Sequence, residues 1–234
     1  MPVKQENIAI VTGASRGIGY AIALELANQG YSLGLIALSI EDLEKAKQKI
    51  SNKYPDVKII TSAFDVADGK SVNNFILRIN EELGNISVLV NNAGDYPTGT
   101  STMPIEELQR LMDVNFLAAT RFVQTVLPSM KKLGKGYIFN IASICGVEAF
   151  ADVGGYCASK FALVGYSSSL AQELSPLGIK VTALCPSWVN TRKASRAPLK
   201  PEDMIRPDDI ALTIRYLLSL GPTATIREIV IHNK

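Results

Sequence analysis

The amino-acid sequence predicts a single-domain α/β fold, a doubly wound parallel sheet of about seven strands with helices on both of its faces. Apolar runs short enough for buried strands alternate with longer amphipathic stretches along the chain. Such alternation requires a parallel sheet whose crossover helices cover both faces. A length of 234 residues fits one domain spanning residues 1–234, and no low-complexity linker divides the sequence.

The first half of the chain alternates strictly between strand and helix patterns. Segment 40–53 has helical spacing, with Leu43, Ala46 and Ile50 on one face. Asp68 or Ser71 is the expected N-cap of the third helix. The predicted strands are 8–12, 31–38, 57–62 and 87–91, and the predicted helices are 17–30, 40–53 and 68–83.

The second half has two helices in succession before the alternation resumes. Pro104 suits the first turn of the earlier helix, because its missing N–H is not needed there. The predicted helices are 104–112, 115–133, 155–174 and 207–220, and the predicted strands are 137–143, 180–185 and 226–232.

Composition excludes several classes of function. Twenty-four basic and 22 acidic residues give a net charge of +2, too balanced for a nucleic-acid or membrane surface. Three cysteines without a CxxC pair indicate neither a disulfide framework nor a zinc site. The N-terminus lacks the apolar stretch of a signal peptide, and no apolar run reaches the roughly 18 residues of a membrane span. We therefore expect a cytoplasmic protein with no nucleic-acid, membrane or metal partner.

A glycine-rich turn joins the first strand to the first helix. Gly13, Gly17 and Gly19 form a GxxxGxG pattern. Glycine suits a tight turn where a pyrophosphate approaches bare backbone N–H groups, and the following helix N-terminus favours an anion. Such a turn alone also serves ordinary loops. Its place between strand and helix favours a nucleotide site in a Rossmann-type fold.

The sequence resembles the short-chain dehydrogenase/reductase superfamily along nearly its whole length, in particular its NADP-dependent ketoreductase-type members. Segment 12–19, TGASRGIG, matches the family's cofactor motif, and segment 91–94, NNAG, matches its second motif. The resemblance implies a nicotinamide-dependent oxidoreductase that moves a hydride between the cofactor and a carbonyl or secondary alcohol. The catalytic residues it implies are Asn115, Ser143, Tyr156 and Lys160. The cofactor-binding residues are Gly13, Ser15, Arg16, Gly17, Ile18, Gly19, Ser39, Asp65, Val66, Asn92, Ala93, Gly94, Tyr156, Lys160, Pro186, Val189 and Thr191.

The implied chemistry needs a proton donor as well as the cofactor's hydride. Tyr156 supplies the proton, but the unperturbed pKa of tyrosine is about 10, so a nearby positive charge must stabilise the phenolate. Lys160 lies one helical turn later on the same face. Ser143 holds the substrate oxygen, and Asn115 resembles the family asparagine that holds a water in the proton relay. A tyrosine and a lysine at this spacing are also common on surface helices.

The cofactor preference depends on the end of the second strand. An acidic residue there favours a ribose 2′-OH, whereas basic residues favour a 2′-phosphate. No carboxylate precedes Glu41, and Arg16 in the glycine turn matches a phosphate. We expect NADP(H) to be favoured over NAD(H), with the Ser39 hydroxyl as a further ligand. Leu38 departs from the family's second basic residue, and Arg16 as a mere solvated cation is the alternative.

Two loops leave alternatives open. Asp65 either contacts the adenine or turns the chain into the next helix. Ser187 replaces the usual glycine after Pro186, which puts the local backbone in doubt. Segment 192–206 corresponds to the family's variable substrate loop, and its basic residues indicate either an anionic substrate or a solvated loop.

Two of the predicted helices indicate that the protein is a homo-oligomer. Helices 155–174 and 115–133 correspond to the family's subunit interface, so we expect a homodimer or homotetramer. The partner is a small carbonyl or alcohol substrate. A non-catalytic NADP(H)-binding regulatory or scaffold protein is the alternative function, and the complete set of Asn115, Ser143, Tyr156 and Lys160 argues against it.

Overall fold

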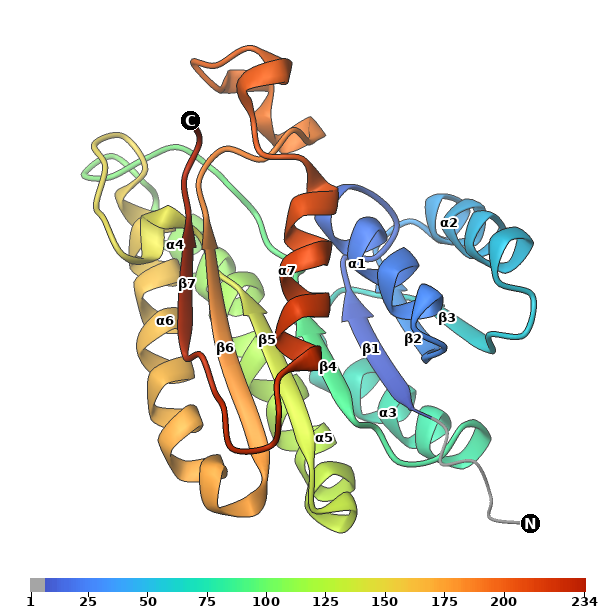
Figure 1. Cartoon of the computed structure of the whole chain (residues 1–234). Coiled ribbons are helices and arrows are strands. Elements are labelled where there is room, and N and C mark those ends of the chain that lie inside the picture. Colours follow the sequence, from blue (N-terminus) through green and yellow to red (C-terminus); the bar gives the residue numbers. More distant parts are fainter. Residues whose placement is uncertain (1–6) are drawn as a thin grey trace, which may run out of the picture.

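Seven parallel strands form one sheet in the order β3-β2-β1-β4-β5-β6-β7 (Figure 1). The computed structural model describes residues 7–234, so segment 1–6, for which the sequence predicts no targeting signal, lies outside the described residues. The strands are β1 (Ile8–Thr12), β2 (Ser32–Ala37), β3 (Ile59–Ala63), β4 (Val88–Asn91), β5 (Gly136–Ile141), β6 (Ile179–Pro186) and β7 (Glu228–Ile231).

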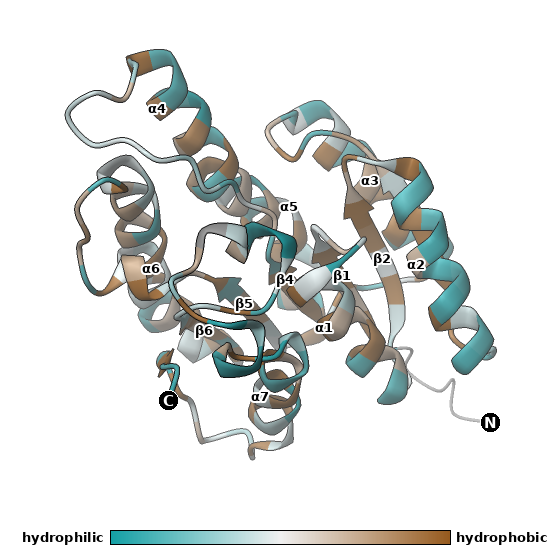
Figure 2. Cartoon of the chain, turned by 90° about the horizontal axis from the view of Figure 1, so that it is seen from above, coloured by the Kyte–Doolittle hydropathy of each residue, from teal (hydrophilic) through white to brown (hydrophobic). Residues whose placement is uncertain are grey.

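Helices cover both faces of the sheet, which confirms the predicted doubly wound fold. One buried apolar cluster joins α1, α2 and α7 to the sheet, and a second joins α3, α5 and α6 to its other face. In Figure 2 strand β2 is hydrophobic, whereas helix α2 on the outside of the sheet is largely hydrophilic. The helices are α1 (Gly17–Asn28), α2 (Ile40–Lys53), α3 (Gly69–Glu82), α4 (Ile105–Met112), α5 (Ala118–Leu133), α6 (Gly154–Leu174) and α7 (Pro207–Ser219).

The strand order reverses between β1 and β4, which both lie at the centre of the sheet. Every residue of β1 and β2 is buried, because helices cover these strands on both sides. In an open parallel sheet, the loops at such a reversal diverge and leave a crevice beyond the carboxyl ends of the strands. The functional site is therefore expected where the loops after β1 and β4 meet.

The two helices predicted for segments 104–112 and 115–133 are one continuous rod. A π-helical turn, Asp113–Leu117, joins α4 directly to α5. Residues that form such a wide turn show no distinct sequence pattern, so the boundary between the helices was predicted wrongly. Single π-turns inside α-helices are frequently found at functional sites. This one carries Asn115.

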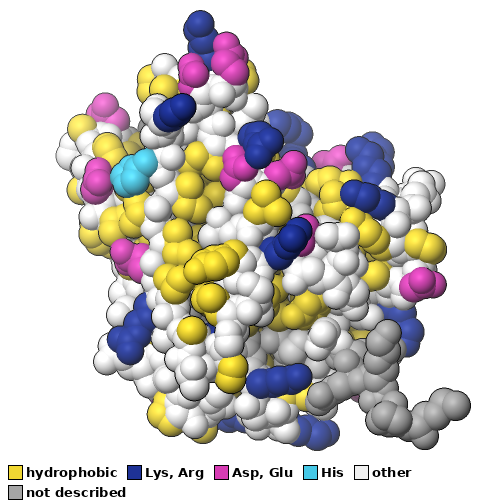
Figure 3. Space-filling model, in the orientation of Figure 1, with side chains coloured by type: hydrophobic (Ala, Val, Ile, Leu, Met, Phe, Trp, Pro, Cys, Tyr) yellow, Lys and Arg dark blue, Asp and Glu magenta, His cyan; other side chains and the backbone are white. Residues whose placement is uncertain are grey.

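The remaining boundaries agree with the predictions to within a few residues. Asp68 caps α3, accepting a hydrogen bond from the Lys70 N–H at 3.0 Å. No helix within residues 7–234 is long and apolar enough to cross a membrane. On the face shown in Figure 3, basic and acidic side chains are interspersed.

Candidate functional site

A cavity of about 470 Å³ opens at the carboxyl ends of the central strands. Loops that are far apart in the sequence line it, including those that follow β1, β2, β3, β4 and β6. The predicted site residues that line it are Gly13, Ser15, Arg16, Gly17, Ile18, Ser39, Asp65, Val66, Asn92, Ala93, Gly94, Tyr156, Lys160 and Thr191. The predicted residues outside its lining are Gly19, Asn115, Ser143, Pro186 and Val189.

The glycine turn leaves backbone groups open toward this cavity. Gly13 and Gly17 have left-handed backbones, with φ of +64° and +56°. A Cβ on Gly19 would lie 2.2 Å from the carbonyl oxygen of Gly13, so this glycine permits α1 to start against the turn. No side chain caps the N-terminus of α1. Its free N–H groups and dipole fit a diphosphate, as a nicotinamide dinucleotide carries.

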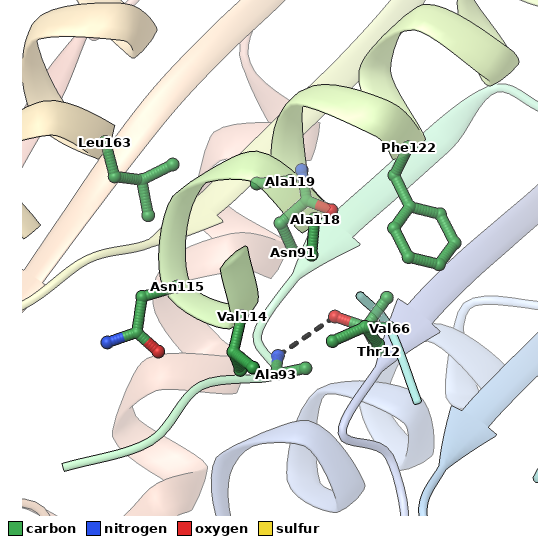
Figure 4. A pocket seen from close by; sticks show the side chains of 10 residues that line it. All are labelled: Thr12, Val66, Asn91, Ala93, Val114, Asn115, Ala118, Ala119, Phe122 and Leu163. Atoms are coloured by element: carbon green, nitrogen blue, oxygen red, sulfur yellow. Dashed lines mark hydrogen bonds between the residues drawn. The ribbon is translucent and has the colours of Figure 1, made fainter. Parts of the chain in front are cut away.

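Thr12 and Asn92 tie the glycine turn to the loop after β4. The Thr12 hydroxyl accepts hydrogen bonds from the Asn92 and Ala93 N–H groups, both at 2.9 Å (Figure 4 draws the second). The Asn92 amide donates to the carbonyls of Thr12 and Gly13, at 2.9 and 3.2 Å. These contacts hold the two sides of the crevice at a fixed separation.

A small internal cavity lies behind this junction (Figure 4). Its volume of about 10 Å³ is close to that of one water molecule, and it is lined by residues that include Asn91 and Asn115. The buried Asn91 amide donates to Asn140, but its side-chain carbonyl oxygen has no hydrogen-bond partner within residues 7–234.

Helix α6 carries Tyr156 and Lys160 one turn apart, facing the cavity. The Lys160 ammonium is buried, donates to the carbonyl of Ile141 at 2.9 Å and lies 5.8 Å from the centre of the Tyr156 ring. Ser143 follows β5 and accepts a hydrogen bond from the Cys145 N–H at 3.1 Å. A hydrogen bond also links the Ser143 and Tyr156 side chains. The structure therefore brings serine, tyrosine and lysine together, and their catalytic roles stay predictions.

Burial controls the protonation of this group. Burial raises the pKa of Tyr156 above its ordinary value, and the Ser143 hydrogen bond only partly opposes this. Burial, reinforced by the positive charge of Lys193, lowers the pKa of Lys160 to about 7. The expected lowering of the Tyr156 pKa by Lys160 is not observed. Desolvation is the largest influence on this pKa, and the group that lowers it is the Ser143 hydroxyl.

Asn115 uses its whole side-chain amide to hold two neighbouring segments. Its oxygen accepts from the Asp95 N–H at 2.7 Å. Its nitrogen donates to the Asp95 carbonyl and to the Ser159 hydroxyl, both at 3.0 Å. The π-turn thus places Asn115 between the loop after β4 and helix α6, so its side chain positions the residues around it. The predicted role in a water relay stays a prediction.

The family follows from comparison with known proteins. The sequence matches the short chain dehydrogenase family over residues 7–201. This chain is a short-chain dehydrogenase. Its fold and order of motifs are those the resemblance implied.

Individual relatives share this architecture. A 3alpha-hydroxysteroid dehydrogenase of Mediterraneibacter gnavus is 33% identical over 92% of this chain and 90% of its own length. The structure of a beta-ketoacyl-[ACP] reductase from Bacteroides thetaiotaomicron is 41% identical, with a TM-score of 0.88 over 99% of this chain and 98% of its own. An alcohol dehydrogenase from the archaeon Thermococcus sibiricus, complexed with 5-hydroxy-NADP, is 31% identical with a TM-score of 0.89, covering 97% and 96%.

In this short-chain dehydrogenase an acidic residue that the sequence analysis missed stands beside Arg16. The Asp42 carboxylate lies 3.9 Å from the Arg16 guanidinium, and both line the cavity. The Ser39 hydroxyl accepts from the Asp42 N–H at 3.2 Å and so caps α2. A serine followed by an acidic residue three positions later is typical of a helix N-terminus. This pattern in the sequence could have placed Asp42 in the first turn of the helix, next to Ser39.

Two open alternatives are clarified by the geometry. The Asp65 carboxylate accepts from the Ala67 N–H at 2.9 Å and pairs with Arg110 at 2.6 Å, so it turns the chain while lining the cavity. Adenine contact stays a prediction. Within residues 7–234, Asp152 is the one non-glycine residue with positive φ, so Ser187 adopts an ordinary backbone in place of glycine.

Proposed function

We propose that this short-chain dehydrogenase is an NADP(H)-dependent oxidoreductase that interconverts a carbonyl and a secondary alcohol, with Tyr156 as the general acid and base. One observation carries the proposal: Ser143, Tyr156 and Lys160 converge beside a cavity whose far end is a glycine turn suited to a diphosphate. A Rossmann-type fold alone would not distinguish an enzyme from a binding protein. The arrangement of proton donor, hydrogen-bonding partner and lysine does.

A bound nicotinamide supplies the hydride in reduction and accepts it in oxidation. The chain itself must hold the substrate oxygen and transfer a proton. Ser143 orients that oxygen through its hydroxyl, and Tyr156 donates its phenolic proton to it in the direction of reduction. Because burial raises the pKa of Tyr156, the proton is present throughout the neutral range. The Lys160 ammonium stabilises the phenolate that remains, and Asn115 keeps the loop after β4 in place.

The preference for NADP(H) is supported by Arg16 and by the apolar end of β2. Residues Ala37 and Leu38 line the cavity and carry no charge to repel a 2′-phosphate. The Arg16 side chain is half exposed, so it is accessible to a phosphate, with Asp42 as a weak competitor at 3.9 Å. The archaeal relative complexed with an NADP derivative agrees with this preference.

We also propose a cytoplasmic homodimer or homotetramer in which segment 192–206 forms the substrate loop. Helix α6 supports the assembly, because its outward face combines the exposed Phe161 with Gly165, around which there is open space.

The buried cysteines are not expected to take part in the chemistry. Burial raises the pKa of the Cys145 thiol to about 11 and that of the Cys185 thiol to about 12. Neither is therefore a reactive thiolate.

A screen of aldehydes, ketones and secondary alcohols, followed at the nicotinamide absorbance, tests the proposal. We expect turnover with at least one carbonyl class and faster turnover with NADPH than with NADH. The competing function is a regulatory protein that binds NADP(H) without turning it over. Tight NADPH binding without turnover of any carbonyl or alcohol would favour that function.

A further inference from the structure

Lys193 connects the proposed cofactor cavity with a second cavity beside it. The residue lies in the short helix Arg192–Arg196, and its ammonium donates to the carbonyl oxygen of Gly94 across the crevice. The second cavity has a volume of about 410 Å³. Its lining consists of Tyr96, Pro97, Thr98, Glu107, Lys193 and Ser195. Lys193 and Tyr96 line both cavities.

Tyr96 places the second cavity next to the proton donor. Its ring meets the Tyr156 ring edge-on, with centroids 4.7 Å apart, and meets Trp188 in the same way at 5.9 Å. A molecule whose carbonyl lies at Tyr156 would therefore pass Tyr96, which lines both cavities, to enter the second one. The charged side chains in the lining of that cavity are Lys193 and Glu107.

The charges around Lys193 leave it suited to an anion. Among residues 7–234 no ion pair forms with Lys193, and its acceptor Gly94 is a neutral carbonyl. Desolvation and the charge of Arg16 lower the pKa of Lys193, while Asp95 raises it. Lys193 in turn disfavours the charged form of Lys160. A carboxylate beside Lys193 would relieve this repulsion between like charges.

We propose that Lys193 binds a carboxylate at the far end of the substrate, so that the substrates of this enzyme are oxo acids and the corresponding hydroxy acids. The inference rests on the proposed oxidoreductase function and names its substrate class. In reduction, the hydride goes from the reduced cofactor to the carbonyl carbon and the Tyr156 proton goes to its oxygen, while the carboxylate is unchanged. Lys193 is a specificity residue, since it contacts the substrate away from the reacting atoms.

Matched acids and esters test this assignment, because methylation removes the negative charge and keeps the carbonyl. The substrate pairs are acetoacetate with methyl acetoacetate and levulinate with methyl levulinate. Wild-type enzyme should prefer the acid of at least one pair. In Lys193→Met, kcat/KM for that acid should fall about 10- to 100-fold, mostly through KM, whereas the value for the ester should change less than about 2-fold. Lys193→Arg should recover much of the loss.

Two further variants sharpen the test. Lys49→Met removes the same kind of charge from α2, at an exposed residue outside the lining of both cavities, and should leave both substrates unaffected. Glu107→Gln removes the anion of the second cavity and should lower KM for the acid. Calorimetric titration of the acid into NADP-loaded enzyme gives the binding change independently of turnover.

Three outcomes would overturn the assignment. These are a wild-type enzyme indifferent to the carboxylate, an equal loss for acid and ester in Lys193→Met, or a loss confined to NADPH affinity in a fluorescence titration. The last would mean that Lys193 contacts the cofactor. Turnover of the neutral esters in these same assays supports the oxidoreductase function even when the carboxylate assignment fails.

Discussion

The Lys160 ammonium lies 5.8 Å from the centre of the Tyr156 ring and donates a hydrogen bond to the backbone carbonyl of Ile141. Burial acts on the two residues in the same sense, because it favours the neutral phenol and the neutral amine. Burying these two ionisable side chains therefore lowers the free energy of unfolding of the protein. This loss of stability can be measured.

Lys160→Met is expected to stabilise the protein while removing its activity. The pKa of Lys160 is lowered from 10.5 to about 7 in the folded state. Between these values the unfolded chain binds more protons, so the contribution of Lys160 to the free energy of unfolding rises with pH across that window. At about pH 7 the variant should gain on the order of 1–3 kcal/mol, after allowing for the hydrogen bond lost at Ile141.

Thermal unfolding without cofactor checks this expectation. A gain of that size corresponds to roughly 2–4 °C per kcal/mol for a chain of this length. The difference between variant and wild type should shrink as the pH is raised toward about 10. Lys200→Met, at an exposed position, should show neither effect. A pH-independent destabilisation in Lys160→Met would contradict the prediction.

Tyr156→Phe should reduce turnover by about 100- to 10,000-fold, the range for loss of a positioned general acid. The phenyl ring keeps its contact with Tyr96, whose centroid lies 4.7 Å away, so the fold and the cofactor site should be unchanged. Steady-state kinetics with the best carbonyl substrate, together with NADPH titration, separates the two effects. A variant that keeps most of the wild-type kcat would remove Tyr156 from the proposed role.

Arg16→Ala should weaken NADPH binding more than NADH binding. A charge-assisted contact with the 2′-phosphate contributes roughly 1.5–3 kcal/mol, which corresponds to about 10- to 100-fold in affinity. NADH has no such phosphate, so its affinity should hardly change. Equal losses for both cofactors would mean that Arg16 shapes the glycine turn.

Asp42→Asn is the matched variant on the other side of the same pair. It removes the carboxylate that lies 3.9 Å from Arg16, and with it a negative charge that would oppose a 2′-phosphate. We expect tighter NADPH binding, by about 2- to 5-fold for an exposed charge, and little change for NADH. Weaker NADPH binding in this variant would show that Asp42 orients Arg16 and does not compete for it.

Phe161→Glu should shift the assembly toward monomer. Phe161 is 43% exposed on α6, close to Gly165 and its surrounding open space. Light scattering should give a dimer or tetramer of the 25.3 kDa chain for the wild type and a smaller species for the variant. Phe150→Glu, at a phenylalanine of 44% exposure outside the helices, is the control. A monomeric wild type at micromolar concentration would contradict the proposal.

Sequence patterns predicted the sheet, the glycine turn and the convergence of Ser143, Tyr156 and Lys160 because these depend on local periodicity and on motif order. They did not predict the π-turn, because the change of phase at the extra residue is indistinguishable in sequence from a break between two separate helices. Nor did they predict Asp42 beside Arg16 or Lys193 at Gly94, because these contacts join segments whose separation is set by the loops. The direction of the Tyr156 pKa shift likewise required knowledge of how deeply the helix buries it.

Because of the π-turn Asp113–Leu117, the position of Asn115 depends on the exact number of residues in the long helix. The composition of the helix does not reveal this dependence. The extra residue of the π-turn is what lets α4 and α5 continue as one rod while Asn115 faces Asp95 and Ser159. Deleting one residue there would replace the π-turn by ordinary α-helical turns. It would also rotate α4 by about 100° relative to α5 and disconnect the amide from its partners. We therefore expect an insertion or deletion in segment 113–117 to disrupt the placement of Asn115. Conservative substitutions along the same helix should leave that placement intact.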